Sequence, residues 1–410
     1  MAADAPALLL KGGAVFDSEA RSFRRGLDVL AIGGRIEAIG PDLPAPAGAR
    51  VIDCGGAYVL PGLIDCHVHL SAGGGADELR TAQGDPAPLR AWKAAEHARR
   101  TLHAGFTTVR DLGAAEHLNI HMARAIEAGI LEGPRILAAG MGVTMTGGHG
   151  HGFIAREADG PDEVRKAVRE QLRAGATAIK LFASGGVMTP GVDPRSPSFT
   201  EAEMAAGVEE AHKAFLVVGA HAQANQGIKN AIRAGVDSIE HGVWLDDEAV
   251  QMMCERGTYL VATLSAPHHI AYGGLQAGIP KFAVDKAEHV LHDHIRSFEL
   301  ARKAGVKLAM GTDEGTPLNH PGENAQEIVR MAEHGLSPAV AIMAATAWAA
   351  DLLHVESGRL EKGLLADMVI VGQDPLEQLD VLTSNEQILG VVKGGVVVRT
   401  SLAAPSGGRN

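Results

Sequence analysis

Short apolar runs alternate with amphipathic segments through the central part of the chain. Eight of these runs have the length and composition of buried β-strands, and they cover residues 63–69, 107–112, 135–139, 178–183, 216–222, 237–241, 259–263 and 307–312. Apolar positions recur at helical spacing in most of the gaps, most clearly at residues 88–104, 162–174, 201–214 and 285–304. Strands that alternate with helices in this way predict an α/β fold, a (β/α)8 TIM barrel.

Both ends of the chain have a different pattern, in which glycine and proline separate short β-type runs. At the N-terminal end these runs are residues 8–11, 14–17, 27–32, 35–39 and 51–52. At the C-terminal end they are residues 367–371 and two strands within 388–398 that flank a glycine turn. We therefore predict a barrel domain at residues 61–358, with one small β-sandwich made from residues 1–60 and 359–402, and a tail at 403–410.

Polar residues that can bind a metal or move a proton lie in or directly after the central apolar runs. They are His67, His69, Lys180, His221, His241 and Asp313. A parallel barrel gathers the C-terminal ends of its strands at one rim, so the six are expected to form one site. A doubly wound open sheet is the alternative fold, but it would not bring all six to one rim.

His67 and His69 are two positions apart at the end of a predicted strand. Side chains at this spacing point to the same face, so both imidazoles can reach one ion. The alternative is a pair of histidines in a polar rim. His221 and His241, at two later strand ends, could supply neutral imidazoles to a second ion, although each by itself is more often a packed histidine.

Lys180 lies inside the apolar run 178–183. Since burying an ammonium is costly, this lysine must lose its proton, form an ion pair or be modified. Next to two cations, one modification is carbamylation by CO₂, and a structural salt bridge is the alternative. Asp313 can be a metal ligand and a proton acceptor, or else the N-cap of the next helix.

As a set, these residues resemble the amidohydrolase superfamily, in the subtype with a binuclear metal centre. The resemblance covers nearly the whole chain, including the opening at residues 60–70. Within the superfamily, segment 180–187, His221 and segment 234–242 resemble the Xaa-Pro dipeptidase-like, ochratoxin-hydrolysing branch most closely. Mononuclear deaminases of this superfamily carry a glutamate shortly after the fifth-strand histidine, and residues 222–225 contain none. The resemblance therefore points away from deamination.

The resemblance also implies a set of roles. His67, His69 and Asp313 would hold one divalent ion and His221 and His241 another, with Zn²⁺ as the expected metal. A carbamate formed from CO₂ on Lys180, and a hydroxide, would bridge the two ions, and Asp313 would be the catalytic proton acceptor. The subunits would form a homo-oligomer such as an octamer.

The implied reaction is hydrolysis of an amide or peptide bond that releases a C-terminal amino acid. Candidate small-molecule substrates are Xaa-Pro dipeptides and N-acyl amino acids such as ochratoxin A. An ester, lactone or phosphotriester hydrolase is the enzymatic alternative, because the same centre serves other electrophiles. A non-catalytic scaffold is the alternative from another class.

The substrate is expected to contact His149, His151 and Gln223. His149 and His151 lie in the glycine-rich segment 146–152, where backbone amides can approach a ligand and a cationic His149 could bind a carboxylate. A mobile loop with incidental histidines is the alternative. Gln223 stands where many relatives have tyrosine or histidine, so their specificity does not carry over.

The sequence does not assign a role to two further pairs of polar residues, and a substrate contact is the alternative for Arg110 and Asp111. Arg110 and Asp111 are expected to form an ion pair at the rim, and His268 and His269 to lie in an exposed loop.

The composition narrows the class of partner. The formal net charge of −12 argues against nucleic acid and against an anionic membrane surface. Three cysteines without paired spacing indicate neither a disulfide framework nor a zinc–thiolate site. Since no signal-peptide pattern or membrane span is recognisable either, we expect a cytoplasmic enzyme.

Overall fold

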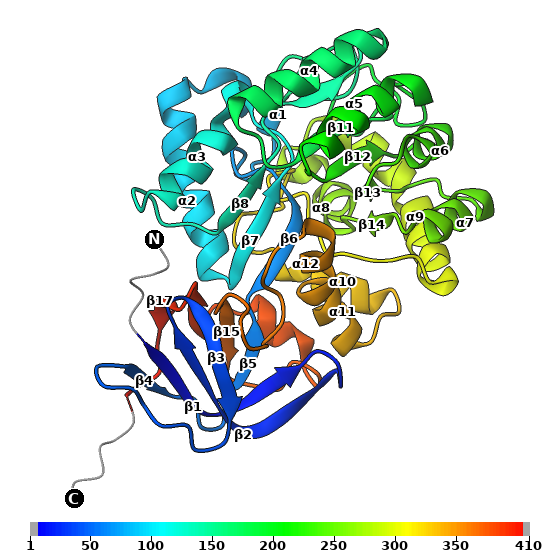
Figure 1. Cartoon of the computed structure of the whole chain (residues 1–410). Helices are drawn as coiled ribbons and strands as arrows, with labels where there is room; N and C mark the ends of the chain where they lie inside the picture. Colours follow the sequence, from blue (N-terminus) through cyan, green and yellow to red (C-terminus); the bar gives the residue numbers. More distant parts are fainter. Residues whose placement is uncertain (1–6, 405–410) are drawn as a thin grey trace, which may run out of the picture.

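A computed structural model describes residues 7–404 and has a mixed α/β fold (Figure 1). Figure 1 shows a sheet made from the two ends of the chain below a set of parallel strands that are surrounded by helices. No helix within the described residues is both long and apolar enough to cross a membrane. Residues 405–410 of the predicted tail lie outside the described part, while the Ala403 carbonyl still accepts a hydrogen bond from Asp53 at 3.2 Å.

The strands of the two chain ends form one eight-stranded sheet. They are β1 (Leu8–Asp17), β2 (Ser22–Ile32), β3 (Arg35–Gly40), β4 (Arg50–Asp53), β5 (Tyr58–Pro61), β15 (Met368–Val371), β16 (Ile388–Lys393) and β17 (Val396–Thr400). The ends of the chain meet where β5 pairs antiparallel with β15, with Leu60 opposite Val369. The prediction that both ends build one β unit is confirmed.

This sheet is continuous, whereas the sequence predicted a sandwich. A register shift around Gly13 divides β1, so its first half pairs with β4 and its second half with β5. A Cβ on Gly13 would lie 3.0 Å from Val59, so glycine permits this close approach. Residues from both halves of the sheet, including Leu10, Ile52 and Met368, pack into one hydrophobic cluster.

The central strands form two parallel sheets. One contains β6 (Leu63–Val68), β7 (Phe106–Asp111) and β8 (Arg135–Ala138), and the other β9 (Gly142–Thr144), β10 (Ala155–Glu157), β11 (Ile179–Phe182), β12 (Val218–Ala222), β13 (Ser238–His241) and β14 (Tyr259–Val261). Seven of the eight predicted central strands are confirmed to within two residues at each end. The short β9 and β10, which flank the glycine-rich loop, were not expected.

The predicted eighth strand at residues 307–312 is not regular. Only single bridges are formed here: Leu308 pairs with β14, and Glu314, two residues beyond the predicted strand, pairs with β6. Its ladder is interrupted because the Met310 N–H donates to the Ala344 carbonyl and the Thr312 N–H to the Asp65 carboxylate. The segment nevertheless bridges β14 and β6.

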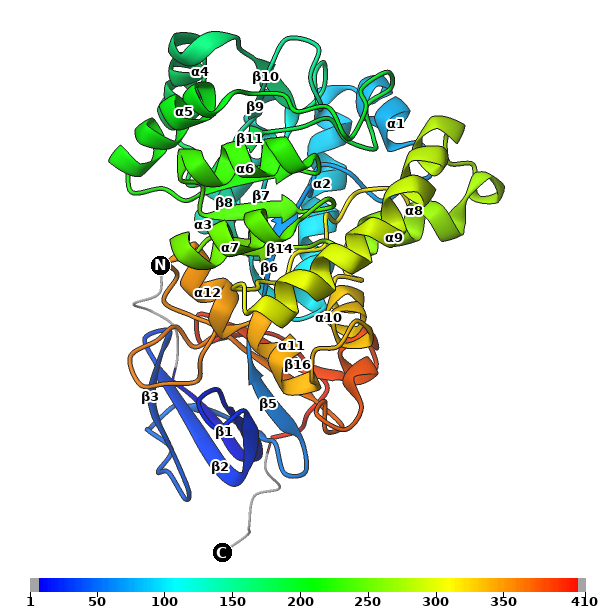
Figure 2. The same cartoon turned by 90° about the vertical axis from the view of Figure 1, so that its right-hand side faces the viewer.

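Helices follow most of the parallel strands. They are α1 (Glu78–Gly84), α2 (Ala87–His103), α3 (Leu118–Glu127), α4 (Gly160–Ala174), α5 (Glu201–Lys213), α6 (Asn225–Ala234), α7 (Asp247–Arg256), α8 (Ser265–Gly273), α9 (Lys281–Ala304), α10 (Ala325–Glu333), α11 (Pro338–Ala344) and α12 (Ala347–Leu353). The four clearest predicted helices correspond to α2, α4, α5 and α9. Figure 2 shows the long α9 beside α8 on one side of the parallel strands.

Cys54 and Cys66 are buried and Cys254 is exposed, and all three are free thiols.

Candidate metal centre and active site

All six predicted metal-site residues line one small cavity at the C-terminal ends of the parallel strands. The cavity has a volume of about 50 Å³, and His149 and Gln223 line it as well. His67 lies in β6, Lys180 in β11, His221 in β12 and His241 in β13, while Asp313 follows the irregular eighth segment. The parallel topology thus brings distant positions together, as the sequence predicted.

His67, His69 and Asp313 form the tightest group. The Nε2 atoms of His67 and His69 each lie 3.4 Å from the same oxygen, Oδ1 of Asp313. This is longer than a good hydrogen bond. It is close to the roughly 3.3 Å that separates two ligand atoms when both sit about 2 Å from one tetrahedral ion. The donor set, two imidazoles and a carboxylate, fits a divalent metal.

Each of the four predicted histidine ligands has one ring nitrogen engaged with the protein. The Nδ1–H groups of His67 and His69 donate to Glu240 and to the Gly113 carbonyl, both at 2.9 Å. These tautomers, assigned from the partners, leave Nε2 with a free lone pair in both rings.

His221 and His241 form a second pair whose ring centres are 4.6 Å apart. His221 Nε2–H donates to the Gly185 carbonyl at 2.8 Å, which frees Nδ1. The Thr263 hydroxyl donates its proton to the Ala262 carbonyl, so it accepts from His241 Nδ1–H at 2.6 Å and leaves Nε2 free. Hydrogen bonds of this kind fix the orientation of metal-binding imidazoles.

Burial keeps these histidines neutral, which is the form that binds metal. Desolvation lowers the pKa of His221 to about 3, and it lowers the pKa values of His67 and His241 well below the ordinary value. The pKa of His69 is lowered for the same reason. Neutral imidazoles with a fixed tautomer present their lone pairs without a competing proton at neutral pH.

Lys180 is buried, with its Nζ 3.5 Å from Nε2 of His67. Desolvation lowers the pKa of its ammonium to about 8. In the described part of the chain Lys180 forms no ion pair with a carboxylate, so the salt-bridge alternative is not supported.

Asp313 is held close to the histidines by its backbone, whose N–H donates to the His67 carbonyl at 2.7 Å. Burial raises the pKa of its carboxyl to about 7. The N-cap alternative is excluded, because the next helix, α10, begins at Ala325 and has Asn324 at its N-cap.

Arg110 and Glu240 form a fully buried ion pair beneath the histidines. The Arg110 guanidinium donates to Glu240 at 2.8 Å and to the Cys66 carbonyl at 2.7 Å, and the opposite oxygen of Glu240 accepts from His67. The predicted rim ion pair of Arg110 with Asp111 is therefore wrong. The Arg110 side chain is fully buried between the parallel strands, and its ion-pair partner, Glu240, lies in β13.

The predicted substrate-binding residues fall into two groups. His149 and Gln223 line the cavity, and the side-chain oxygen of Gln223 is buried without a hydrogen-bond partner among the described residues. His151 does not line it; its Nδ1 instead contacts the Gly148 carbonyl at 2.7 Å.

The expectation of a cationic His149 needs correction. Burial, together with the nearby His221 and Lys180, lowers the pKa of His149 well below the ordinary value. The ring is thus neutral at physiological pH and can offer a hydrogen bond but no positive charge. Its Nδ1 contacts the Thr189 hydroxyl at 2.7 Å.

His268 and His269 lie in α8 and are half-buried, so the prediction of an exposed loop is wrong for this pair. They occupy the same short helix as Ala266, Pro267 and Ile270, which form part of the cavity wall. The sequence pattern around them was too short to reveal a helix.

A family model described as "Amidohydrolase family" matches residues 58–398. The chain belongs to the amidohydrolase family. Ochratoxinase of Aspergillus niger is 33% identical over 381 residues, which cover 85% of this chain and 77% of that protein. The predicted resemblance to the amidohydrolase superfamily and to this branch is confirmed.

Similar solved structures support the assignment of this amidohydrolase to the same branch of the family. A Xaa-Pro dipeptidase with methionine bound in its active site has a TM-score of 0.87 and 34% identity, covering 95% of this chain and 99% of that one. A prolidase in complex with N-methylphosphonate-L-proline has a TM-score of 0.90 and 33% identity, covering 96% and 100%.

Strained backbone marks the rim of the amidohydrolase site. His241, Thr263 and Asp313 have positive φ angles of 72°, 53° and 58°, although none is glycine. Such conformations cost of order 1–3 kcal/mol each and persist where the surrounding contacts impose them. Sequence reasoning missed this feature, and it also missed Thr263 and Glu240 as partners of histidines. A carboxylate inside the apolar strand at 238–241 was the only available signal for Glu240.

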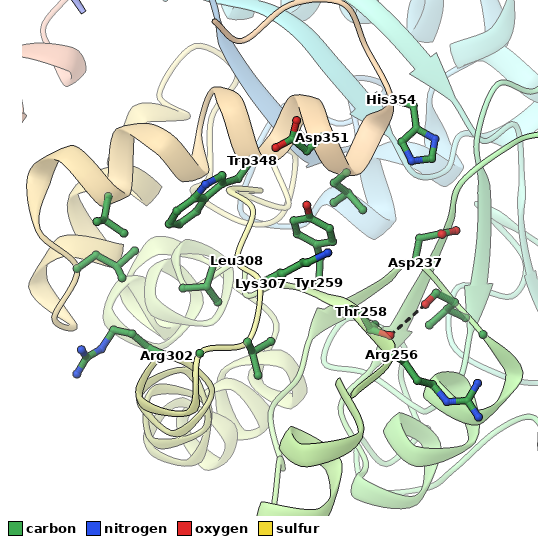
Figure 3. Close-up of a pocket in the computed structure, with 18 of the residues that line it drawn as sticks. Asp237, Arg256, Thr258, Tyr259, Arg302, Lys307, Leu308, Trp348, Asp351 and His354 are labelled. Carbon is green, nitrogen blue, oxygen red and sulfur yellow. Dashed lines mark hydrogen bonds between the residues drawn. The ribbon is translucent and has the colours of Figure 1, made fainter. Parts of the chain in front are cut away.

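Two larger cavities differ in their relation to this site. One, of about 630 Å³, adjoins the inner cavity and shares His69, His149 and Asp313 with it, so it offers room for a substrate. The other, of about 1050 Å³, is lined by Asp237, Thr258 and Tyr259, near the beginnings of β13 and β14 (Figure 3). Because the histidines lie where these strands end, the first cavity adjoins the candidate site and the second lies away from it.

Proposed function

We propose that this amidohydrolase is a metal-dependent enzyme that hydrolyses an amide or peptide bond and releases a C-terminal amino acid. The observation that carries the proposal is the set of four histidines, each of which donates from one ring nitrogen and presents the other. Lys180 and Asp313 complete a set suited to two ions. We also infer that the bridging eighth segment closes residues 61–358 into a (β/α)8 barrel.

His67, His69 and Asp313 would hold one ion and His221 and His241 the other, with a carbamate on Lys180 between them. Two divalent ions, for which Zn²⁺ is the expected metal, lower the pKa of water and polarise a substrate carbonyl. Burial lowers the pKa of the Lys180 ammonium to about 8, so the neutral amine is more accessible near neutral pH than in an exposed lysine. Only the neutral amine can attack CO₂; it loses a proton and becomes a carbamate.

Asp313 would move protons during hydrolysis. Its carboxylate would accept the proton of the attacking water and then deliver it to the leaving amine. Gln223 and a neutral His149 would orient the substrate by hydrogen bonds. The cavity of about 630 Å³ would receive the rest of the substrate.

The names of the relatives suggest the substrate class. Ochratoxinase and the Xaa-Pro dipeptidase and prolidase structures support N-acyl amino acids and dipeptides as candidates. A homo-oligomer such as an octamer and a cytoplasmic location remain predictions.

The test is a hydrolysis screen of dipeptides, N-acyl amino acids and ochratoxin A, with metal content measured on the same sample. Release of a C-terminal amino acid by protein that holds about two ions supports the proposal. If the protein hydrolyses esters, lactones or phosphotriesters but no amide, the proposal is wrong and the alternative hydrolase function holds. A metal-free protein without hydrolytic activity, after expression with ample zinc, would indicate a scaffold.

We expect Lys180→Ala to bind fewer metal ions and to lose about 100-fold in kcat/KM, because the bridging carboxylate is gone. Metal analysis and intact mass check this, since the wild type should carry the added mass of CO₂. Formate or acetate should restore part of the activity. Two bound ions and full turnover in the variant would disprove the bridging role.

We expect His149→Ala to weaken recognition of the substrate carboxylate. Loss of a hydrogen bond to a charged group costs about 1.5–3 kcal/mol. The measurement is kcat/KM for an N-acyl amino acid and for the corresponding C-terminal amide. The free acid should lose more than the amide. His151→Ala in the same loop is the comparison, with a smaller effect expected because His151 does not line the cavity. If kcat/KM falls equally for the free acid and the amide, His149 does not recognise the substrate carboxylate.

A further inference from the structure

Lys286 on α9 contacts the loop that follows β11. Its ammonium donates hydrogen bonds to the backbone carbonyl oxygens of Gly186, Thr189 and Val192 at 3.1, 2.7 and 2.6 Å. An ammonium has three N–H donors and no acceptor, so each donor has a partner here. Three carbonyl dipoles that converge on one point repel one another unless a cation lies between them.

The same loop supports two histidines of the site. The Gly185 carbonyl accepts from His221 Nε2–H at 2.8 Å, one residue before the first contact of Lys286. The Thr189 hydroxyl lies 2.7 Å from His149 Nδ1 and accepts from the Gly150 N–H at 3.0 Å. Lys286 binds the carbonyl of this same Thr189.

The loop is packed tightly against the cavity. A Cβ on Gly186 would lie 2.5 Å from Nε2 of His149, so the backbone rests directly on the ring. Val187 and Met188, between the carbonyls that Lys286 binds, form part of the cavity wall. A small displacement of this loop would therefore move the wall, His149 and the partner of His221 together.

We propose that Lys286 is a positioning residue that holds the loop at residues 185–192 in the geometry the site requires. This inference rests on the proposed function, because that function gives His149 and His221 their roles. α9 also holds the end of β13 and the loop after it: His294 Nε2–H donates to the His241 carbonyl at 3.0 Å and the Ser297 hydroxyl to the Val243 carbonyl at 2.6 Å. One helix thus positions both loops relative to the strands.

Lys286→Ala tests the proposal by two measurements. Hydrogen exchange of the amides in residues 185–192 should become at least about tenfold faster, and kcat/KM should fall at least about tenfold, since each lost bond involves a charged donor. Lys281→Ala is the matched control: Lys281 lies on the same helix and pairs with Asp285 at the surface, at 2.6 Å. It should leave both measurements unchanged.

Chemical rescue separates positioning from a general loss of structure. The substitution removes the atoms of a propylammonium ion, and a surface cavity of about 370 Å³ next to Lys286 gives such an ion access. Propylammonium should slow the exchange and raise kcat/KM again, whereas tetramethylammonium, which has no N–H donor, should not. Equal recovery with both ions, recovery with neither, or an unaltered Lys286→Ala variant overturns the proposal.

The outcome can be distinguished from failure of the proposed function. If the wild-type protein hydrolyses none of the screened compounds, the proposed function fails. Exchange in residues 185–192 would still show whether Lys286 holds the loop, because that measurement requires no turnover.

Discussion

Replacing Asp313 with asparagine is expected to lower kcat by about 10²–10⁴-fold, the usual contribution of a general acid–base group. Asparagine keeps the shape and one oxygen that could bind a metal, but it cannot accept a proton. In the structure one carboxylate oxygen of Asp313 lies 3.4 Å from Nε2 of both His67 and His69. Burial raises the pKa of this carboxyl to about 7. Steady-state kinetics and metal analysis on the same preparation check the result.

The control for this prediction is Asp162→Asn, which removes an exposed carboxylate from the start of α4. It changes the net charge equally and should leave kcat unaltered. If Asp313→Asn retains its metal and turns over at nearly the wild-type rate, the proton acceptor is another group.

Replacing Arg110 with methionine is expected to lower the free energy of unfolding by about 3–5 kcal/mol, the range for removing one partner of a buried ion pair. Arg110 and Glu240 are both fully buried, and methionine leaves the Glu240 carboxylate without its cation. The remaining donors, the Ser238 hydroxyl and the His67 imidazole, do not neutralise the charge. Urea unfolding followed by circular dichroism measures the loss.

Two further variants show whether the pair is the cause. Arg110→Met combined with Glu240→Met should recover much of the stability, because no uncompensated charge remains. This double variant should bind metal more weakly than the wild type, since His67 has lost its hydrogen-bond acceptor. Arg359→Met, which breaks the surface pair with Asp351 at 2.7 Å, should cost at most about 1 kcal/mol. Similar losses for Arg110→Met and Arg359→Met would refute the buried-pair explanation.

The sequence by itself determined the order of strands and helices and the six residues that gather at one cavity. Both follow from local patterns. Apolar runs specify buried strands, and the spacing of His67 and His69 directs both to one face. A lysine inside an apolar run, Lys180, is conspicuous because its burial is costly.

Only the tertiary structure decided how those residues are held and in which protonation state. His67 obtains its acceptor from Glu240, 173 positions away, and Arg110 finds the same carboxylate 130 positions away. No local pattern specifies such partners, because they are set by which strands lie beside one another once the chain has folded. For the same reason, His149 is neutral rather than cationic: the loop at residues 185–192 covers it, and burial disfavours the charged ring.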